Sequence, residues 1–262
     1  HMRQVMADFH SMRDVADEYQ CVGAGVGVPG PVTEQSTVSR CANLGWENVN
    51  MAQELSARAG VPVRVANDAN LAALGEAWQG GGKGCRNLVL LTVGTGIGGG
   101  IICDGRIIAG ATGAGGEVGH MPVPFHTDWP CGCGRKGCLE VTASATGIIR
   151  AARQYSPFKE MDKVTAKDVY DAAAAGDKNA VSVVAESSAA LGYAAAAVSC
   201  VVNPEVILLG GGVSAAGRAL LDPVEAAFRA YAFPACAGAR FALAQLGNNA
   251  GIYGGAALFF AG

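Results

Sequence analysis

The stretch from Gly115 to Glu140 decides how the rest of this sequence is interpreted. It begins Gly-Gly-Glu-Val-Gly-His (115–120) and ends Cys-Gly-Cys-Gly-Arg-Lys-Gly-Cys-Leu-Glu (131–140). Three thiolates and one imidazole complete a tetrahedral shell for zinc and leave no open position for a catalytic water. The clustered cysteines and the upstream histidine therefore predict a structural zinc ion that holds a loop in place.

A loop held by a metal ion fixes the side chains that it carries. Glu117, His120 and Glu140 would then be rigid, and oriented groups of this kind suit the hydroxyls of a polyhydroxylated ligand. Two alternatives stay open from the residues alone: clustered cysteines can form disulfides, and His120 can be an ordinary buried histidine. The sequence shows no signal peptide, and its nine cysteines are an odd number. A closed disulfide framework therefore fits less well than a metal.

The bulk composition narrows the class of protein. The chain has 262 residues, of which half are hydrophobic and 16% are charged, and its net charge is −3. This length suffices for one large domain or two smaller ones, and without a basic patch or tail nucleic acid is not an expected partner. The longest apolar stretch, residues 189–202, is interrupted by Gly192 and Ser199, so it predicts a buried core helix and not a membrane span. His1-Met2 resembles a cloning remnant and plays no part in the fold.

Strand-like and helix-like segments alternate over most of the chain, which is typical of the α/β class. Apolar residues at helical spacing predict helices, and short β-branched runs predict buried strands. The expected helices are residues 3–19, 51–59, 70–78, 141–154, 166–175, 179–202, 216–231 and 251–260. The expected strands are residues 21–28, 61–65, 88–93, 101–102, 106–109, 206–209 and 240–246.

Asp68 is the first candidate catalytic residue. With Asn67 it follows the predicted strand 61–65, at the carboxyl end where α/β sheets place their ligands. In phosphoryl transfer to an alcohol, a positioned aspartate accepts the hydroxyl proton while the phosphoryl group moves. The alternative, which the pair alone favours, is an aspartate that caps the helix beginning just after it.

Two glycine-rich segments follow apolar strands. Gly94–Gly100 (Gly-Thr-Gly-Ile-Gly-Gly-Gly) would present backbone N–H groups and the Thr95 hydroxyl to phosphate oxygens, or would only form a tight hairpin turn. It lacks the Gly-Lys-Ser/Thr of a Walker-A loop. Gly210–Gly212 would let a ribose or a flat ring approach the backbone closely, or would only connect a strand to a helix.

The order of these motifs is more specific than any one of them. Along the chain come Pro-Gly-Pro (29–31), Asn-Leu-Gly-Trp (43–46), Asn-Asp (67–68), the two glycine-rich segments and, between them, the cysteine-glycine motif. From about residue 20 to the end, this order resembles the ROK family of bacterial sugar kinases, open reading frames and repressors, and within it the glucokinase branch. The resemblance implies the α/β actin-like ATPase fold of the hexokinase type (ribonuclease H-like), with sugar and nucleotide in a cleft between two lobes.

The resemblance also implies a role for each motif. Asp68 would be the general base that takes the proton from the sugar 6-hydroxyl, and magnesium would accompany the ATP. The sugar contacts would be Asn43, Asn67, Asp68, Glu117, His120 and Glu140. The zinc ligands would be His120, Cys131, Cys133 and Cys138, so that His120 serves metal and sugar through its two ring nitrogens. The nucleotide contacts would be Thr95, Gly96 and Gly98 at the phosphates and Gly210, Gly211 and Gly212 at the adenosine.

Two departures from the family pattern are visible. The family begins with a hairpin carrying Asp-x-Gly-Gly-Thr, which holds the other side of the triphosphate, and this sequence contains no such segment. If that hairpin is truly absent, the small lobe is truncated at its N-terminus, and we expect weak or no kinase turnover with sugar and zinc binding better preserved. The segment between His120 and Cys131 is one residue longer than usual and contains His126, a rival zinc ligand, although His120 is favoured.

The sequence therefore predicts a cytoplasmic, ATP-dependent hexose kinase that converts glucose to glucose 6-phosphate. The alternatives are a kinase for N-acetylmannosamine, fructose or mannose, and a sugar-binding protein without turnover, either a truncated kinase or the effector domain of a repressor. We expect residues 3–68 to be the remainder of a small N-terminal lobe and residues 69–262 a large lobe with the zinc loop 115–140, with the last helix packing back on the small lobe. By the resemblance the chain would form a homodimer or a dimer of dimers, with no nucleic acid or membrane partner.

Overall fold

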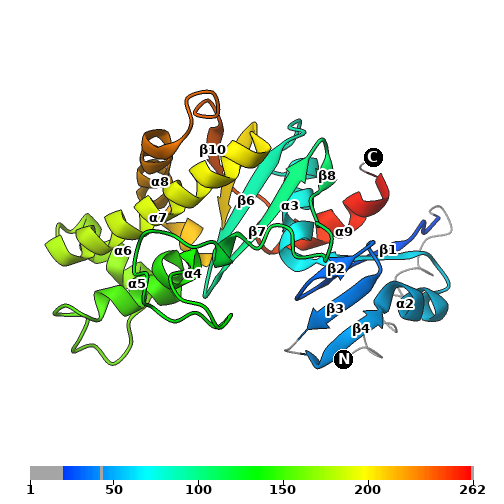
Figure 1. Ribbon diagram of the computed structural model, residues 1–262, viewed down its shortest axis with the longest axis horizontal. Coiled ribbons are helices and arrows are strands. Elements are labelled where there is room, and N and C mark those ends of the chain that lie inside the picture. The colour runs from blue at the N-terminus through cyan, green and yellow to red at the C-terminus, as the bar shows by residue number, and fades with distance from the viewer. Residues whose placement is uncertain (1–19, 42–43, 261–262) are drawn as a thin grey trace.

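A computed structural model describes residues 20–41 and 44–260 of the chain (Figure 1). Its central feature is a five-stranded sheet with the strand order β10-β9-β6-β7-β8. The strands are β6 (Leu88–Val93), β7 (Ile97–Cys103), β8 (Arg106–Ile107), β9 (Val206–Gly210) and β10 (Arg240–Leu243). β10, β9 and β6 run parallel, whereas β6, β7 and β8 form an antiparallel meander. The central strands β6 and β9 are continuous apolar runs because both faces of the sheet are covered.

Helices cover both faces of this sheet (Figure 1). One face carries α4 (Leu139–Ala143), α5 (Ala145–Ala152), α6 (Ala166–Ala174), α7 (Lys178–Val202) and α8 (Arg218–Tyr231). Leu91 and Leu209 point into this layer and pack in one core with Leu191 and Phe228. The other face carries α3 (Asp68–Gln79) and α9 (Ala250–Phe260), and the alternate strand residues pack there. The alternation of side chains along each strand therefore supplies two separate cores.

The 25-residue helix α7 is long and apolar enough to cross a bilayer by length and composition alone. However, 56% of its most apolar window is buried inside the protein. Leu191 and Ala195 are completely buried in the core that α7 shares with the sheet. The expected core helix is thus confirmed, and it begins one residue earlier than predicted.

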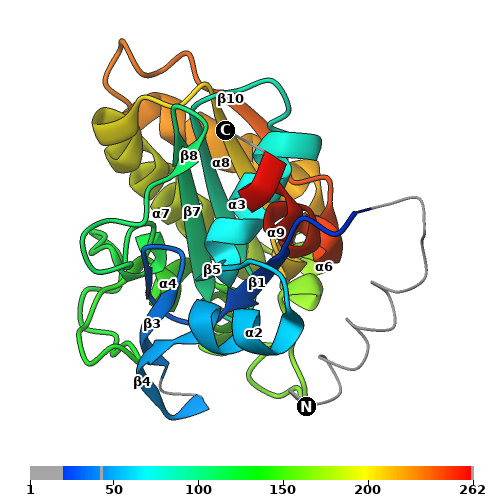
Figure 2. The ribbon, with the colours of Figure 1, turned by 90° about the vertical axis from the view of Figure 1, so that its right-hand side faces the viewer.

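The remaining strands lie at the other end of the molecule. β1 (Ala24–Val28) runs parallel to β5 (Val63–Asn67), and β2 (Val32–Thr33), β3 (Thr37–Cys41) and β4 (Trp46–Asn50) form an antiparallel sheet. The helix α2 (Met51–Ala59) packs its apolar face on Val38 and Val65 in a third core. Figure 2 shows β1 and β5 between α2 and α9.

The last helix connects the two ends of the molecule through very close backbone contacts. A side chain at Gly254 would overlap the backbone of Leu71 in α3, and one at Gly25 in β1 would overlap the backbone of Gly255. Glycine is needed at these points because the helices and the strand touch main chain to main chain. α9 therefore packs on β1 as well as on α3, whereas the expected division at residue 68 stays a prediction.

Several expected elements differ from those observed. The predicted helix 141–154 is two helices, because the buried Ser144 leaves helical geometry and accepts a hydrogen bond from the Gly147 N–H at the start of α5. The predicted strand 61–65 is shifted to 63–67, and the strands β2 to β4 were missed. The predicted helix 3–19 lies outside the described residues.

Candidate active site

A cleft of about 880 Å³ opens between the β5–α3 junction and the β6–β7 hairpin. Most of the predicted site residues line it, although they come from widely separated parts of the chain. They are Asn67, Asp68, Thr95, Gly96, Gly98, Glu117, His120, Glu140 and Gly211. Of the other predicted contacts, Gly210 is the buried last residue of β9 and Gly212 lines a neighbouring cavity. Asn43 lies outside the described residues.

Asn67 and Asp68 have different roles at the start of α3. Asn67 ends β5 in an extended conformation, and its Oδ1 accepts hydrogen bonds from the N–H groups of Ala69 (2.9 Å) and Asn70 (3.2 Å). Asn67 is therefore the helix cap. The exposed Asp68 carboxylate faces the cleft and, among the residues that the structure describes, accepts only from the Ala69 N–H, at 2.9 Å. Asn67, and not Asp68, is thus the cap of α3. The Asp68 carboxylate keeps free positions that can accept hydrogen bonds.

Asn67 has little capacity left for a ligand. Its oxygen is used by the helix cap, and its Nδ2 donates to the Gly30 carbonyl at 3.3 Å. One N–H of the amide remains for a ligand atom that accepts a hydrogen bond. The contact to Gly30 also draws the Pro29-Gly30 turn to the cleft wall, a role that the sequence reading did not assign to that turn.

The predicted glycine-rich loop 94–100 is shorter in the structure. Val93 pairs with Ile97, so the turn contains only Gly94, Thr95 and Gly96, whereas Gly98 lies within β7. The turn is held from behind, since the Thr146 hydroxyl donates to the Thr95 carbonyl at 2.8 Å. Thr95 itself is exposed toward the cleft. This arrangement presents a fixed backbone turn and one hydroxyl to a ligand.

A second cavity of about 460 Å³ shares Gly94 and Thr95 with the cleft. Its other walls come from α5, α6 and the segment after β9, and consist largely of small apolar residues. They include Ala145, Ala166, Tyr170, Gly212, Val213 and Ala216. The sequence reading found the glycines but missed Tyr170 and Val213, because only the fold brings α6 next to β9. Burial raises the pKa of the Tyr170 hydroxyl to about 12, and Lys167 and Asp171 supply the charged part of the lining.

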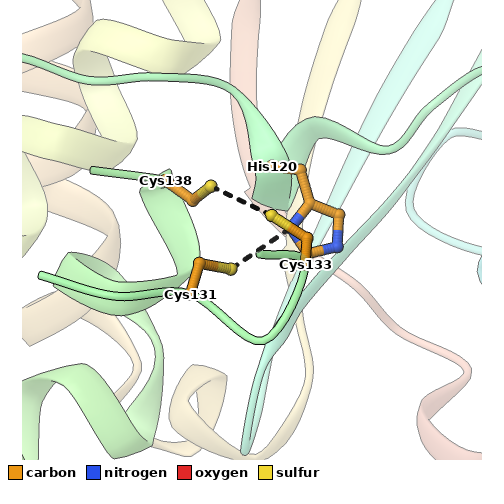
Figure 3. A group of neighbouring side chains, drawn as sticks. All are labelled: His120, Cys131, Cys133 and Cys138. Carbon is orange, nitrogen blue, oxygen red and sulfur yellow. Dashed lines mark hydrogen bonds between the residues drawn. The ribbon is translucent and has the colours of Figure 1, made fainter. Parts of the chain in front are cut away.

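The predicted metal ligands converge. The donor atoms of His120, Cys131, Cys133 and Cys138 all lie within 4.8 Å of one another (Figure 3). The Sγ atoms of Cys133 and Cys138 are 3.7 Å apart, and Cys131 Sγ is 3.6 Å from His120 Nδ1. A tetrahedral ion with metal–sulfur bonds of about 2.3 Å separates two sulfurs by about 3.8 Å. The four residues are therefore compatible with a closed metal site.

The alternatives to this donor set do not match the geometry. None of the nine cysteines, all of which lie within the described residues, forms a disulfide. His126, the rival ligand, stacks on Trp129 with a centroid distance of 3.7 Å, and its Nε2 lies 3.3 Å from Glu186 Oε1. His120 is instead placed with its Nδ1 toward the cysteines and its other ring nitrogen pointing away from them (Figure 3).

The thiols of the cluster differ in charge. A hydrogen bond from the Arg135 backbone N–H lowers the pKa of Cys133 to about 6, whereas burial raises the pKa of Cys138 to about 12. Cys133 therefore loses its proton more readily than Cys138, whose proton a bound cation would have to replace. Metal binding at this site would release protons.

Glu140 joins the metal cluster to the hairpin turn. It lies in the first turn of α4, two residues after Cys138, and its Oε2 accepts from the Ile97 N–H at 3.0 Å. Its Oε1 is 3.8 Å from Cys131 Sγ. A shift of the cysteine loop would therefore move the turn at Gly94–Gly96 as well.

Comparison with known families identifies this arrangement. The profile of the ROK family matches residues 2–261, almost the whole sequence. The chain belongs to the ROK family. Its fold is the actin-like ATPase fold that the sequence predicted, and solved ROK sugar kinases share it.

Individual relatives include glucokinases and a repressor. The chain is 46% identical to a glucokinase of Halalkalibacterium halodurans, over 89% of this chain and 74% of that protein. It is 33% identical to a xylose repressor of Caldicellulosiruptor bescii, over 78% of this chain and 53% of the repressor. Among solved structures, a ROK glucokinase from Streptomyces griseus in complex with glucose and AMPPNP matches with a TM-score of 0.77 and 32% identity, over 99% of this chain and 88% of that one.

Proposed function

We propose that this ROK-family protein is a hexose kinase that transfers the γ-phosphoryl group of ATP to glucose, giving glucose 6-phosphate and ADP. The observation that carries the proposal is the single cleft that contains Asp68, Glu117, His120 and Glu140 beside the Gly94–Gly96 turn. The acids and the imidazole can bind the hydroxyls of a sugar, and the backbone turn beside them can bind a phosphate chain. The glucokinases among the relatives support the same reaction.

In this proposal Asp68 is the general base. Its carboxylate is exposed to the cleft and is not used as the helix cap. As the sugar oxygen attacks the γ-phosphorus and the bond to the bridging oxygen of ADP breaks, the hydroxyl proton passes to Asp68. Asp68 is the first residue of α3, so the helix holds its carboxylate at a fixed place on the cleft wall.

The sugar hydroxyls are held by groups on the other side of the cleft. Glu117 and Glu140 offer carboxylate oxygens, His120 offers the ring nitrogen that faces away from the cysteines, and Asn67 offers its remaining N–H. The resemblance adds Asn43 to this set. A sugar with several hydroxyls satisfies acceptors and donors of this kind, and a ligand without them would leave buried polar groups unpaired.

The nucleotide occupies the part of the cleft that leads into the second cavity. The Gly94–Gly96 turn with Thr95 and the first residues of β7 up to Gly98 bind the phosphates. Gly211, Gly212 and the largely apolar second cavity hold the adenosine. Gly211 lines the cleft, and its φ of 83° and its contact with the Val93 carbonyl leave no room for a side chain there. Magnesium, when bound with ATP, screens the charge of the transferred phosphoryl group.

We further propose that the Cys₃His cluster holds zinc. A closed shell of one imidazole and three thiolates has no position for a reacting water, so the ion is structural. Its function is to fix the loop that ends in Glu140 and the ring of His120, both of which face the sugar. His120 would then bind the metal through Nδ1 and the sugar through Nε2.

The remaining proposals concern the setting of the reaction. Free cysteines and a demand for ATP favour the cytoplasm. As the family resemblance implies, we propose a homodimer or a dimer of dimers, with residues 3–68 as part of a small lobe and residues 69–262 as the large lobe. The division is supported by the separate core of β1 to β5 and α2.

Coupled measurement of ADP release tests the function. With ATP and zinc-loaded protein, glucose should give the highest kcat/KM, ahead of mannose, fructose and N-acetylmannosamine. ADP release that does not depend on any of these sugars would refute the kinase assignment.

The similarity to a xylose repressor supports a second candidate, a sugar-binding protein without turnover. Calorimetry separates the two functions. Glucose that binds with a defined affinity but causes no ADP release would establish the second candidate in place of the first.

A further inference from the structure

Asn70 carries a polar atom that the fold leaves without a partner. The residue lies in the first turn of α3, two residues after Asp68, and is only 3% exposed. Its Oδ1 is buried and accepts no hydrogen bond within the described part of the chain. An unpaired buried acceptor of this kind costs about 1–3 kcal/mol, so its presence beside the proposed base calls for a physical reason.

The surroundings of this atom form a junction of three backbones. A Cβ at Gly116 would lie 3.3 Å from Asn70 Oδ1 and 3.1 Å from the Gly99 carbonyl oxygen. A Cβ at Gly100 would lie 3.2 Å from the Cα of Asn70. The helix α3, the strand β7 and the segment before Glu117 therefore touch with almost no side chains between them, and Asn70 is the polar group at their meeting point.

Unused donors lie next to this unused acceptor. Throughout residues 20–41 and 44–260, no protein acceptor is found for the backbone N–H of Gly116 or of Glu117, although Gly115 and Val118 on either side both donate. An acceptor without a donor and donors without an acceptor thus occupy adjacent positions. A small shift of the segment would join them.

We propose that Asn70 is a positioning residue for the sugar-binding loop: when the sugar binds, Asn70 Oδ1 accepts a hydrogen bond from the backbone N–H of the Gly116–Glu117 segment. This inference rests on the proposed function. The bond fixes Glu117, which grips the sugar, relative to the helix that presents Asp68. Because the bond forms only in the sugar-bound arrangement, part of the sugar's affinity depends on Asn70 without any contact between the two.

Two measurements that need no turnover test this inference on the zinc-loaded protein. The first is the glucose dissociation constant by calorimetry, and the second is hydrogen exchange of the 115–118 segment with and without glucose. In the wild type, glucose should slow exchange of this segment about tenfold. Asn70→Ala should lose this slowing and bind glucose about tenfold more weakly, a change that corresponds to one hydrogen bond.

Two further variants keep the test decisive. Ser188→Ala removes a buried hydroxyl that is equally unpartnered but lies in α7, so its glucose affinity should stay within twofold of the wild type. Asn70→Asp keeps an acceptor oxygen in place and should retain the exchange slowing, which covers the case in which Asn70→Ala does not fold. Wild-type affinity and slowing in Asn70→Ala, or loss of both in Asn70→Asp, would overturn the inference. A wild type that binds no hexose would instead refute the proposed function itself.

Discussion

The burial of Glu76 allows a quantitative prediction about how the helix that carries Asp68 is held. Its side chain is 0% exposed, and its carboxylate accepts hydrogen bonds from the N–H groups of Gly81 (2.8 Å), Gln245 (2.9 Å) and Leu246 (2.7 Å). Hydrogen bonds to a charged group contribute about 1.5–3 kcal/mol each. Since Gln245 is exposed and water can replace its bond, we expect Glu76→Ala to lower the free energy of unfolding by about 3–5 kcal/mol.

Urea denaturation followed by circular dichroism measures this loss. Glu76→Gln keeps the shape but turns an NH₂ group toward a donor, so a loss of about 2 kcal/mol is expected. Glu54→Ala is the matched control, because Glu54 is exposed on α2 and forms an ion pair with the exposed Arg58. The stability of this variant should change by less than about 1 kcal/mol. If Glu76→Ala were no less stable than Glu54→Ala, the idea that Glu76 fastens α3 to the chain entering α9 would be wrong.

Three other predictions concern acid stability, the cleft backbone and the metal. Backbone N–H groups of Asn87 and Arg86 lower the pKa of Glu205. The contribution of Glu205 to the free energy of unfolding is therefore complete above its unfolded pKa and is lost as the pH falls through its folded pKa. Glu205→Gln should thus lose less stability than the wild type between pH 6 and pH 3, and equal losses in urea titrations would contradict this. Gly211→Ala should raise the ATP dissociation constant at least tenfold, because the φ of 83° and the Val93 carbonyl exclude a side chain; unchanged nucleotide affinity by calorimetry would argue against the cleft assignment. Cys131→Ser should bind less than one zinc per chain by elemental analysis and bind glucose more weakly, whereas full zinc content would remove Cys131 from the ligand set.

The elements that were predicted correctly are those that a short stretch of sequence specifies by its own composition. The strands β6 and β9 are short, strongly apolar runs, and the long helix α7 is rich in alanine and valine. The strands β3 and β4 were missed because Thr-Val-Ser-Arg-Cys and Trp-Glu-Asn-Val-Asn are rich in polar residues and show little alternation of polar and apolar residues. Their pairing partners, and not their own composition, make them strands.

The break at Ser144 shows a different limit of sequence reading. A serine between Ala143 and Ala145 is expected to be a helical position, but here its side chain accepts from the Gly147 N–H and starts a new helix. The Ala145 N–H is thereby directed to the Gly94 carbonyl at 2.8 Å. The break is thus caused by a tertiary contact with the hairpin turn, which no local pattern contains.

The candidate site was predictable to the extent that its residues are close in sequence or carry a family motif. The metal ligands fall within one loop, and Asp68 follows directly from its strand. Asn70 was missed because a buried asparagine in a helix has no distinctive pattern, and only the three-dimensional structure shows that its Oδ1 lacks a partner. Tyr170 was missed for the related reason that α6 meets the β9 segment only in the folded protein.

The most direct test of the account is the turnover of Asp68→Asn compared with its glucose binding. If the Asp68 carboxylate takes the hydroxyl proton, kcat should fall by about 10²–10⁴ while the glucose dissociation constant stays within threefold of the wild type. Asp104→Asn, on the exposed β7–β8 turn, should leave kcat unchanged. An Asp68→Asn protein that retains more than a tenth of the wild-type kcat would contradict the assignment of the base.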